Sequence, residues 1–294
     1  MEKSKVYFIK ELSPENVVKM FKELGKNLPN KVAVKVHSGE EGNQNYLHPE
    51  FMKPIVEYVN GTVVECNTAY SGERNTTKKH LKTIEKHGWF KFFNVDLLDA
   101  EGPDFVLPVK NGKHLHEDYL GKNITNYSSM LVLSHFKGHP MGGYGGALKQ
   151  LSIGCASSAG KAWIHSAGKN LDQYTLWNNL PPQDHFLESM AEAASAVVDY
   201  FKGNIAFINI MCNMSVDCDC CAVAEDPCIK DIGILASLDP VAIDKACLDL
   251  VEKSSDAGKE HFLERVNSRN GIHTIDVAEK LGVGTTNYEL IKIQ

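Results

Sequence analysis

The sequence predicts an α/β protein in which helices flank largely parallel sheets and the chain forms two lobes. Short apolar runs, typical of buried strands, alternate with segments of helical period. Polar, glycine-containing loops follow the strands, and 294 residues suffice for two α/β lobes. We therefore treat residues 1–294 as one α/β unit, with an N-terminal lobe at 1–128 and a C-terminal lobe at 129–294.

The N-terminal lobe is expected to alternate strands with helices. Residues 31–37 read KVAVKVH, in which the valines recur at every second position, as on one face of a strand. Ser13 and Pro49 are typical of helix starts. We expect strands at 5–9, 31–37, 61–66, 95–98 and 105–109, and helices at 16–24, 49–58 and around Leu81 and Ile84. This order is typical of a parallel sheet.

The C-terminal lobe begins with the stretch 131–165, where a short apolar run, a glycine-rich turn and a helix at 147–153 follow one another. A long amphipathic helix is expected at 186–201. Asp239 followed by Pro240 predicts another helix start. The remaining strands are expected at 205–210, 231–236 and 288–293, and the remaining helices at 241–251, 261–266 and 274–281.

Composition excludes some classes of partner. The formal net charge is −6 and only three arginines occur, which argues against a protein that binds nucleic acid through its phosphates. No apolar run approaches the roughly 20 residues that cross a bilayer. The N-terminal MEKSKVYFIKEL has charges where a signal peptide needs its apolar region. We therefore expect a cytoplasmic protein that binds neither nucleic acid nor membranes.

The glycine-rich turn after the first strand of the C-terminal lobe is the leading candidate site. In open α/β sheets, ligands bind beyond the carboxyl ends of strands. His135 and His139 can each ligate a metal or move a proton near neutral pH, and Lys137 lies between them. Glycines before a helix can leave backbone N–H groups free to bind an anion. The turn matches neither a P-loop nor a Rossmann fingerprint, so the alternative is a tight turn that packs a helix onto the sheet.

A cysteine cluster forms the second candidate. Thiolates suit zinc, copper(I) and iron–sulfur clusters, but the spacing matches neither a zinc ribbon nor a ferredoxin. A metal site, a redox thiol and a structural turn therefore stay open as alternatives. Five of the eight cysteines, from Cys212 to Cys228, fall in this cluster, and the other three, at positions 66, 155 and 247, are expected to be buried thiols. The residues of the cluster that we assign to metal binding are Cys218, Cys220, Cys221 and Cys228.

A third candidate lies in the loop after the strand at 61–66. Arg74 is one of three arginines, and a guanidinium in a glycine-containing loop can bind a carboxylate through two hydrogen bonds. The alternative is a solvated loop charge.

Two segments resemble a known family. HFKGHPMGGYGGALKQLSIGCASSAGK and the later CDC…DIGILASLDPVAIDKACLDLV are similar to the iron–sulfur centre proteins grouped as domain of unknown function 362. Many members of that family carry a two-cluster ferredoxin module after the A-G-K-like segment. Here residues 169–184 occupy that position and contain no cysteine, so we do not expect [4Fe–4S] clusters.

A second resemblance concerns the chemistry. His139 followed by G-Y-G-G-A-L-K is similar to the signature of lactate-racemase-type enzymes, which use a nickel cofactor tethered to a lysine. The resemblance implies that His139 is an acid–base group, Lys149 the tether and His165 a nickel ligand. In the loop that holds the second catalytic histidine of those enzymes, this chain has Glu73, which can also transfer protons.

Our leading hypothesis is a metal-dependent enzyme that acts on a small anionic compound, a carboxylate, by proton transfer at an α-carbon. The metal is nickel, zinc or iron. The alternatives are a non-catalytic redox or metal-binding protein that uses the cysteine loop, served by a separate ferredoxin in electron transfer, and a purely structural role for both clusters. The residues assigned to the enzyme are His139, Lys149, His135 and Glu73 as catalytic groups, Arg74, Gly143, Gly145, Gly146 and Lys137 as substrate-binding groups, and His165 with the cysteines as metal ligands.

Overall fold

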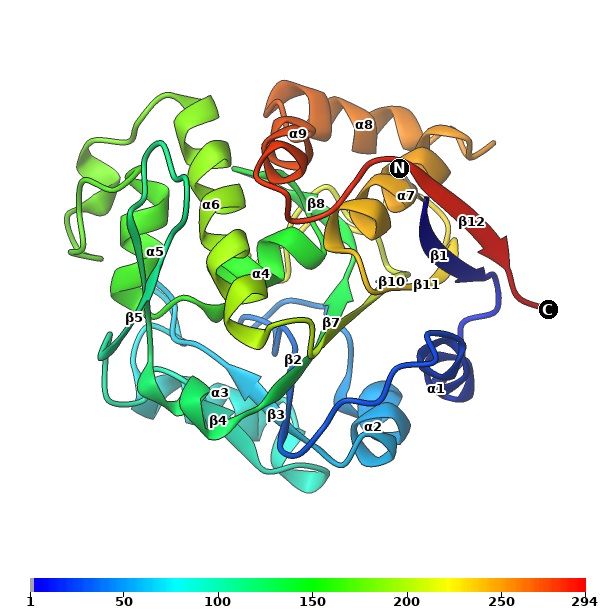
Figure 1. Cartoon of the computed structure of the whole chain (residues 1–294), viewed down its shortest axis with the longest axis horizontal. Coiled ribbons are helices and arrows are strands. Elements are labelled where there is room, and N and C mark those ends of the chain that lie inside the picture. Colours follow the sequence, from blue (N-terminus) through cyan, green and yellow to red (C-terminus); the bar gives the residue numbers. More distant parts are fainter. Residues whose placement is uncertain (1–2) are drawn as a thin grey trace.

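A computed structural model, which describes residues 3–294, has a central eight-stranded sheet with helices on both faces (Figure 1). Only β11 runs antiparallel to the other strands of this sheet. The strands follow one another in the order β12 (Tyr288–Lys292), β1 (Ser4–Ile9), β11 (Gly233–Ser237), β10 (Ile205–Met211), β7 (Ser129–His135), β2 (Val32–Lys35), β3 (Gly61–Glu65) and β4 (Val95–Leu97). The predicted α/β fold with a largely parallel sheet is thus confirmed.

The faces of the sheet bury different helices because side chains alternate along each strand. On β7, Met130 and Val132 join one core, whereas Leu131 and Leu133 join the other. The helices that pack on the first face are α4 (Ala147–Cys155), α5 (Ser158–His165), α6 (Gln183–Phe201), α7 (Pro240–Glu252), α8 (Lys259–Ser268) and α9 (His273–Lys280). Those on the second face are α1 (Pro14–Glu23), α2 (Pro49–Tyr58) and α3 (Thr77–Lys86).

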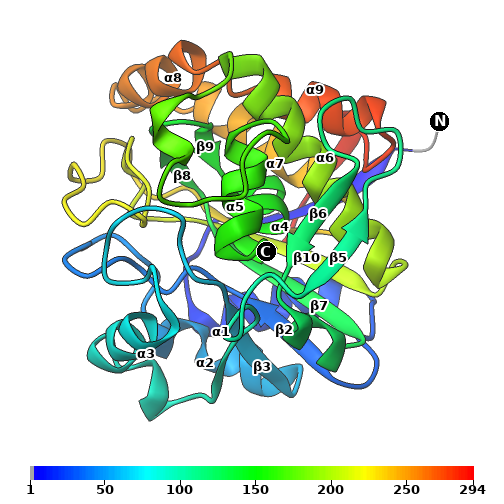
Figure 2. The same ribbon diagram turned by 90° about the vertical axis from the view of Figure 1, so that its left-hand side faces the viewer.

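Two small hairpins lie outside the main sheet. The first, β5 (Phe105–Pro108) and β6 (Glu117–Leu120), packs beside α5 and α6 (Figure 2). The second, β8 (Lys137–His139) and β9 (Gly143–Gly145), occupies the expected glycine-rich turn. Single 3₁₀ turns complete the described structure at η1 (Trp89–Lys91), η2 (Lys122–Asn126) and η3 (Leu176–Asn178).

The strands of the main sheet come from both of the expected lobes. β7, which opens the C-terminal lobe, pairs with β2 of the N-terminal lobe, and β1 pairs with β11 and β12. The division at residue 128 stays a prediction, but a single sheet runs through it. Within residues 3–294, no helix is both long and apolar enough to cross a bilayer.

Candidate functional site

The loops that follow β2, β3, β7 and β10 meet at one edge of the sheet, because these strands are parallel and end at the same side. They enclose a cavity of about 530 Å³. His37 enters it from the loop after β2, Arg74 from the loop after β3, His139 from the hairpin after β7, and Cys220 from the loop after β10. The predicted position of the site, at the carboxyl ends of strands, therefore coincides with this cavity.

The histidine turn and the cysteine loop form one site. The ligating atoms of His139, Cys218 and Cys220 lie within 4.8 Å of one another, which a single metal ion could span. The Gly138 N–H donates to the Ser215 carbonyl at 2.8 Å and joins the hairpin to the cysteine loop. The Asn43 amide donates to the carbonyls of Cys218 and Cys221, at 3.3 and 2.8 Å, and fixes the loop from the opposite side.

Lys149 projects from the first turns of α4 toward this group. Its Nζ lies 3.6 Å from the Cys218 sulfur, and both side chains are buried. Burial opposes ionisation of the Cys218 thiol, but a hydrogen bond from Cys220 and the charge of Lys149 together hold its pKa well below the usual range. Burial likewise opposes the charge on Lys149, yet the Cys218 thiolate raises the pKa of the amine. The two groups form a buried thiolate–ammonium pair.

The hydrogen bonds of His139 fix its tautomer. Its Nδ1 accepts the backbone N–H groups of Met141 and Gly142, at 3.1 and 2.8 Å, so the neutral ring carries its proton on Nε2. That nitrogen lies 3.9 Å from the Cys220 sulfur. Burial, reinforced by the charge of Lys149, lowers the pKa of His139, so the ring is neutral near pH 7.

His165 carries its proton on the other ring nitrogen, Nδ1. Its Nδ1–H donates to the Lys161 carbonyl at 2.7 Å, and its Nε2 has no hydrogen-bond partner within residues 3–294. The ring lines the cavity, stacked on Phe186 with centroids 4.7 Å apart. Burial lowers its pKa to about 3, so the ring presents a free lone pair at neutral pH. It lies outside the group of three candidate ligands, which differs from the implied role as a metal ligand.

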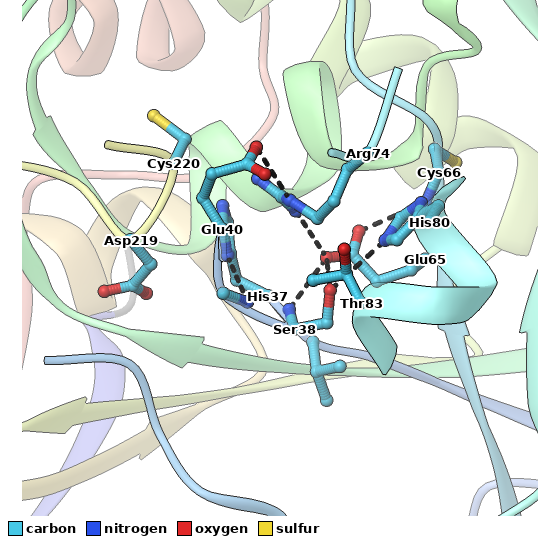
Figure 3. Close-up of polar contacts among 12 residues, drawn as sticks. His37, Ser38, Glu40, Glu65, Cys66, Arg74, His80, Thr83, Asp219 and Cys220 are labelled. Carbon is cyan, nitrogen blue, oxygen red and sulfur yellow. Dashed lines mark hydrogen bonds and ion pairs between the residues drawn. The ribbon is translucent and has the colours of Figure 1, made fainter. Parts of the chain in front are cut away.

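Arg74 lines the cavity, but it is already held by two carboxylates of the protein, Glu40 and Glu65 (Figure 3). Nε lies 3.3 Å from Glu40, Nη1 lies 3.4 Å from Glu65, and Nη2 donates to the Tyr70 hydroxyl at 2.8 Å. Glu65 also pairs with Lys35 at 3.0 Å. Two carboxylates thus offset two buried cations, and we expect Arg74 to shape the wall rather than to bind a carboxylate.

His135 and Lys137 lie behind the cysteine loop and do not line the cavity. His135 bonds Asp219 through Nδ1 at 2.9 Å and the Cys212 carbonyl through Nε2 at 2.6 Å. Lys137 pairs with the same carboxylate at 2.8 Å. Burial disfavours the ionised carboxylate, but the two neighbouring cationic groups hold the pKa of Asp219 below its usual range. These expected catalytic and substrate-binding residues therefore anchor the loop.

The glycines expected to bind an anion have a packing role. The N–H groups of Ala147 and Leu148, at the start of α4, donate to the Asp244 carboxylate at 2.8 and 3.0 Å. A Cβ atom on Gly146 would lie 2.4 Å from Asp244 Oδ1, so this close approach requires glycine. The missing Cβ of Gly145 likewise leaves room for the Lys149 stem, and Gly143 has a φ of 80°. The helix N-terminus is already capped by the chain's own anion.

Three residues that the sequence assigned to the site remain. Glu73 and Cys228 lie apart from the cavity, and Cys221 lines it. The Glu73 side chain is 47% exposed and pairs with Lys79. Cys228 donates to the Met214 carbonyl and lies outside the group of three ligands. Cys221 lines the cavity beside Cys220.

Several residues that line the cavity were assigned no function from the sequence. Those without a predicted role are Lys35, His37, Glu65, Tyr70, Gln150 and Lys161. His37 ends a predicted strand, which was a usable signal. Burial lowers its pKa to about 4. Gln150 and Lys161 lie on helices, where a polar residue that faces a cavity has the same sequence pattern as one that faces solvent.

Comparison with solved structures found partial matches at low sequence identity. One solved structure is the lactate racemase apoprotein from Thermoanaerobacterium thermosaccharolyticum, with a TM-score of 0.44, 12% identity and coverage of 69% of this chain and 50% of that one. Another is a structural-genomics target protein from Thermotoga maritima, with a TM-score of 0.40, 10% identity and coverage of 91% and 58%. The chain thus spans only 50% and 58% of the lengths of these two proteins.

Comparison with curated proteins gave no match. The profile of the family described as domain of unknown function (DUF362) matches residues 32–249, which include every residue of the candidate metal group. Because this match covers well over half of the sequence, the chain belongs to the DUF362 family.

Proposed function

We propose that this protein is an enzyme that holds a soft transition-metal ion through Cys218, Cys220 and His139 and acts on a small carboxylate compound in the adjoining cavity. The observation that carries the proposal is the group of three soft donors, buried or half-buried within 4.8 Å of one another, at the wall of a 530 Å³ cavity.

The donor set fits such an ion. Two sulfurs and one imidazole suit zinc, nickel or iron better than the hard ions magnesium or calcium. Nε2 is the nitrogen of His139 that faces the two sulfurs and would be the ligand atom, because Nδ1 is occupied by two N–H groups. A bound metal would supply Lewis acidity, which polarises an oxygen of the substrate.

The charges around the cavity support an anionic substrate. Lys35 and Arg74 are balanced by Glu65 and Glu40, whereas the ammonium groups of Lys149 and Lys161 have no carboxylate within ion-pair distance among the described residues. His165 presents its free Nε2 to the same space. We assign His165 the role of proton acceptor at the carbon next to the substrate carboxylate, and Lys149 that of holding charge beside Cys218.

Elemental analysis of protein purified without oxygen and without added metal tests the proposal. We expect about one equivalent of nickel, zinc or iron, lost in Cys218→Ser and retained in the matched control Cys228→Ser, which changes a thiol outside the group. Absence of metal from the folded wild-type protein after incubation with each ion would contradict it, as would equal loss from both variants.

A second candidate, a metal-free redox thiol centre, is favoured by the same histidine. In the neutral ring, the Nε2 proton of His139 is directed at the sulfurs, which suits a thiolate acceptor. The Cys218 thiolate and the Cys220 thiol would together lose two electrons and one proton as one disulfide forms, and a separate ferredoxin would accept the electrons in two one-electron steps. A reversible Cys218–Cys220 disulfide found by mass spectrometry in metal-free protein would favour this candidate.

A further inference from the structure

We infer that Lys161 and Gln150 bind the carboxylate of the ligand, in the part of the cavity formed by α4 and α5. This inference rests on the proposed function for the class of substrate. It moves anion recognition from Arg74, where the sequence placed it, to two residues that the sequence left without a role.

Lys161 is a buried amine that no direct ion pair balances among residues 3–294. Burial lowers its pKa, and the more distant charges of Asp99 and Glu65 oppose this effect. Its side chain lines the cavity and is 6% exposed. Nζ donates to the Ala156 carbonyl at 2.6 Å, and no carboxylate of residues 3–294 lies within ion-pair distance of it. Asp99, the neighbouring acid, instead accepts the N–H groups of Asn67 and Ser158, at 2.9 and 3.0 Å. An ammonium group can donate three hydrogen bonds, so two remain for a ligand.

Gln150 offers a second, neutral donor. Its Oε1 accepts a hydrogen bond from Lys35 Nζ at 3.1 Å, and this contact fixes which end of the amide is the donor. Its Nε2 is buried and has no hydrogen-bond partner among residues 3–294. A Cβ atom on Gly154 would lie 2.5 Å from Oε1, so the glycine makes room for this orientation. A buried donor without a partner is costly, and an oxygen of a ligand in the cavity would satisfy it.

The other cations of the cavity are less suited. Lys35 bonds the Val36 carbonyl, Glu65 and Gln150, and Arg74 bonds two carboxylates and a hydroxyl. Lys149 lies against the Cys218 sulfur. Lys161 combines an unbalanced charge with free donors, and its carbonyl accepts the Nδ1–H of His165 one helical turn away. A carboxylate held by Lys161 would therefore lie in the same part of the cavity as the free imidazole nitrogen.

Titration calorimetry with acetate as the probe and acetamide as its uncharged analogue tests the inference. We expect wild-type protein to bind acetate at least tenfold more tightly than acetamide. Lys161→Met, which keeps the length of the side chain but removes the charge, should weaken acetate binding at least tenfold. Gln150→Leu should weaken it severalfold, and Lys161→Arg should recover much of the affinity. Lys169→Met, at an exposed lysine just beyond α5, is the matched control and should bind like wild type.

The outcomes separate this inference from the proposed metal site. Unchanged acetate affinity in folded Lys161→Met, or a wild-type protein that holds metal and binds no acetate, would overturn the inference alone. Acetate binding that depends on Lys161 in a protein without metal would support the inference and contradict the metal site. If Lys161→Met fails to fold, Gln150→Leu decides: wild-type affinity for acetate in that variant would overturn the inference.

Discussion

The cysteine loop and the start of α4 both looked like ligand sites in the sequence, and each meets a buried carboxylate, Asp219 within the loop and Asp244 from α7. In the loop, Asp219 meets His135 and Lys137, and these groups hold its pKa below the usual range against the effect of burial. At the start of α4, Asp244 meets backbone N–H groups, an amide and a hydroxyl, and burial raises its pKa to about 6. Neighbouring basic groups more than offset the cost of burying Asp219 in its ionised form. The dipoles around Asp244 offset only part of the same cost.

The positions of these two carboxylates explain why the cysteine loop is open to a ligand and the start of α4 is not. Asp219 lies behind the cysteine loop, so Cys220 and Cys221 remain at the cavity wall. Asp244 occupies the donors at the helix N-terminus that an anion would need. A glycine-rich turn before a helix therefore predicts an anion site only when no side chain of the protein caps it.

Loss of the charge on Asp219 should have the largest effect. Asp219→Asn leaves the buried Lys137 ammonium without its partner, and we expect the free energy of unfolding to fall by about 4 kcal/mol. Urea unfolding measures this change. Asp217→Asn is the matched control in the same loop, because Asp217 pairs with the partly exposed Arg265 and should contribute about 1 kcal/mol or less. Equal effects of the two variants would refute the difference between the regions.

Removal of Asp244 should come next. Asp244→Ala leaves the N–H groups of Ala147 and Leu148 buried without an acceptor, which should lower the free energy of unfolding by about 3 kcal/mol. Asp199→Ala removes an exposed acid and should change it by less than about 0.5 kcal/mol. If the start of α4 can hold an external anion once Asp244 is gone, added phosphate should stabilise Asp244→Ala more than the wild type, in which Asp244 occupies these N–H groups.

A third buried carboxylate, Asp118, should make the free energy of unfolding depend on pH. Its buried oxygens have no side-chain hydrogen-bond partner, and burial raises its pKa from 3.8 to about 7. The folded state thus takes up this proton at a higher pH than the unfolded state does. The contribution of Asp118 to stability is therefore greatest below about pH 4 and is lost as the pH rises through about 7. We expect Asp118→Asn to raise the free energy of unfolding at pH 8 by about 2 kcal/mol, half of the 4 kcal/mol that a shift of this size could contribute.

Unfolding measured between pH 5 and pH 8 checks this expectation. The curve for Asp118→Asn should be flatter than that of the wild type, whereas Glu117→Gln, at an exposed neighbouring acid, should leave the slope unchanged. Parallel curves for the wild type and Asp118→Asn would show that Asp118 ionises normally.

The smallest effect is expected at Glu73. Its side chain is exposed and pairs only with Lys79, so Glu73→Gln should change the free energy of unfolding by less than about 0.5 kcal/mol. Metal content and acetate affinity should also equal those of the wild type. A loss of metal or of acetate affinity in Glu73→Gln would support the role at the site that the sequence predicted for Glu73.

The sequence alone determined the succession of strands and helices. The helix expected at 49–58 is observed at Pro49–Tyr58, and those expected at 186–201 and 241–251 agree within a few residues. Local periodicity and helix caps carry this information, because they depend on neighbours along the chain. The hairpin at residues 137–145 and the strand at 117–120 were missed, since their short or polar segments have no clear alternation.

Tertiary structure decided which chemically active residues meet. The sequence pointed to His139, Lys149, His165 and the cysteine loop, and all of them reach one cavity or its wall. It could not tell that Asp219 and Asp244 engage His135 and the start of α4, because these contacts join residues 84 and 97 positions apart. The charge that stays unpaired in the cavity, at Lys161, is likewise a property of packing. Free donors and balanced charges depend on distances between segments, and those are set when the sheet and its helices assemble.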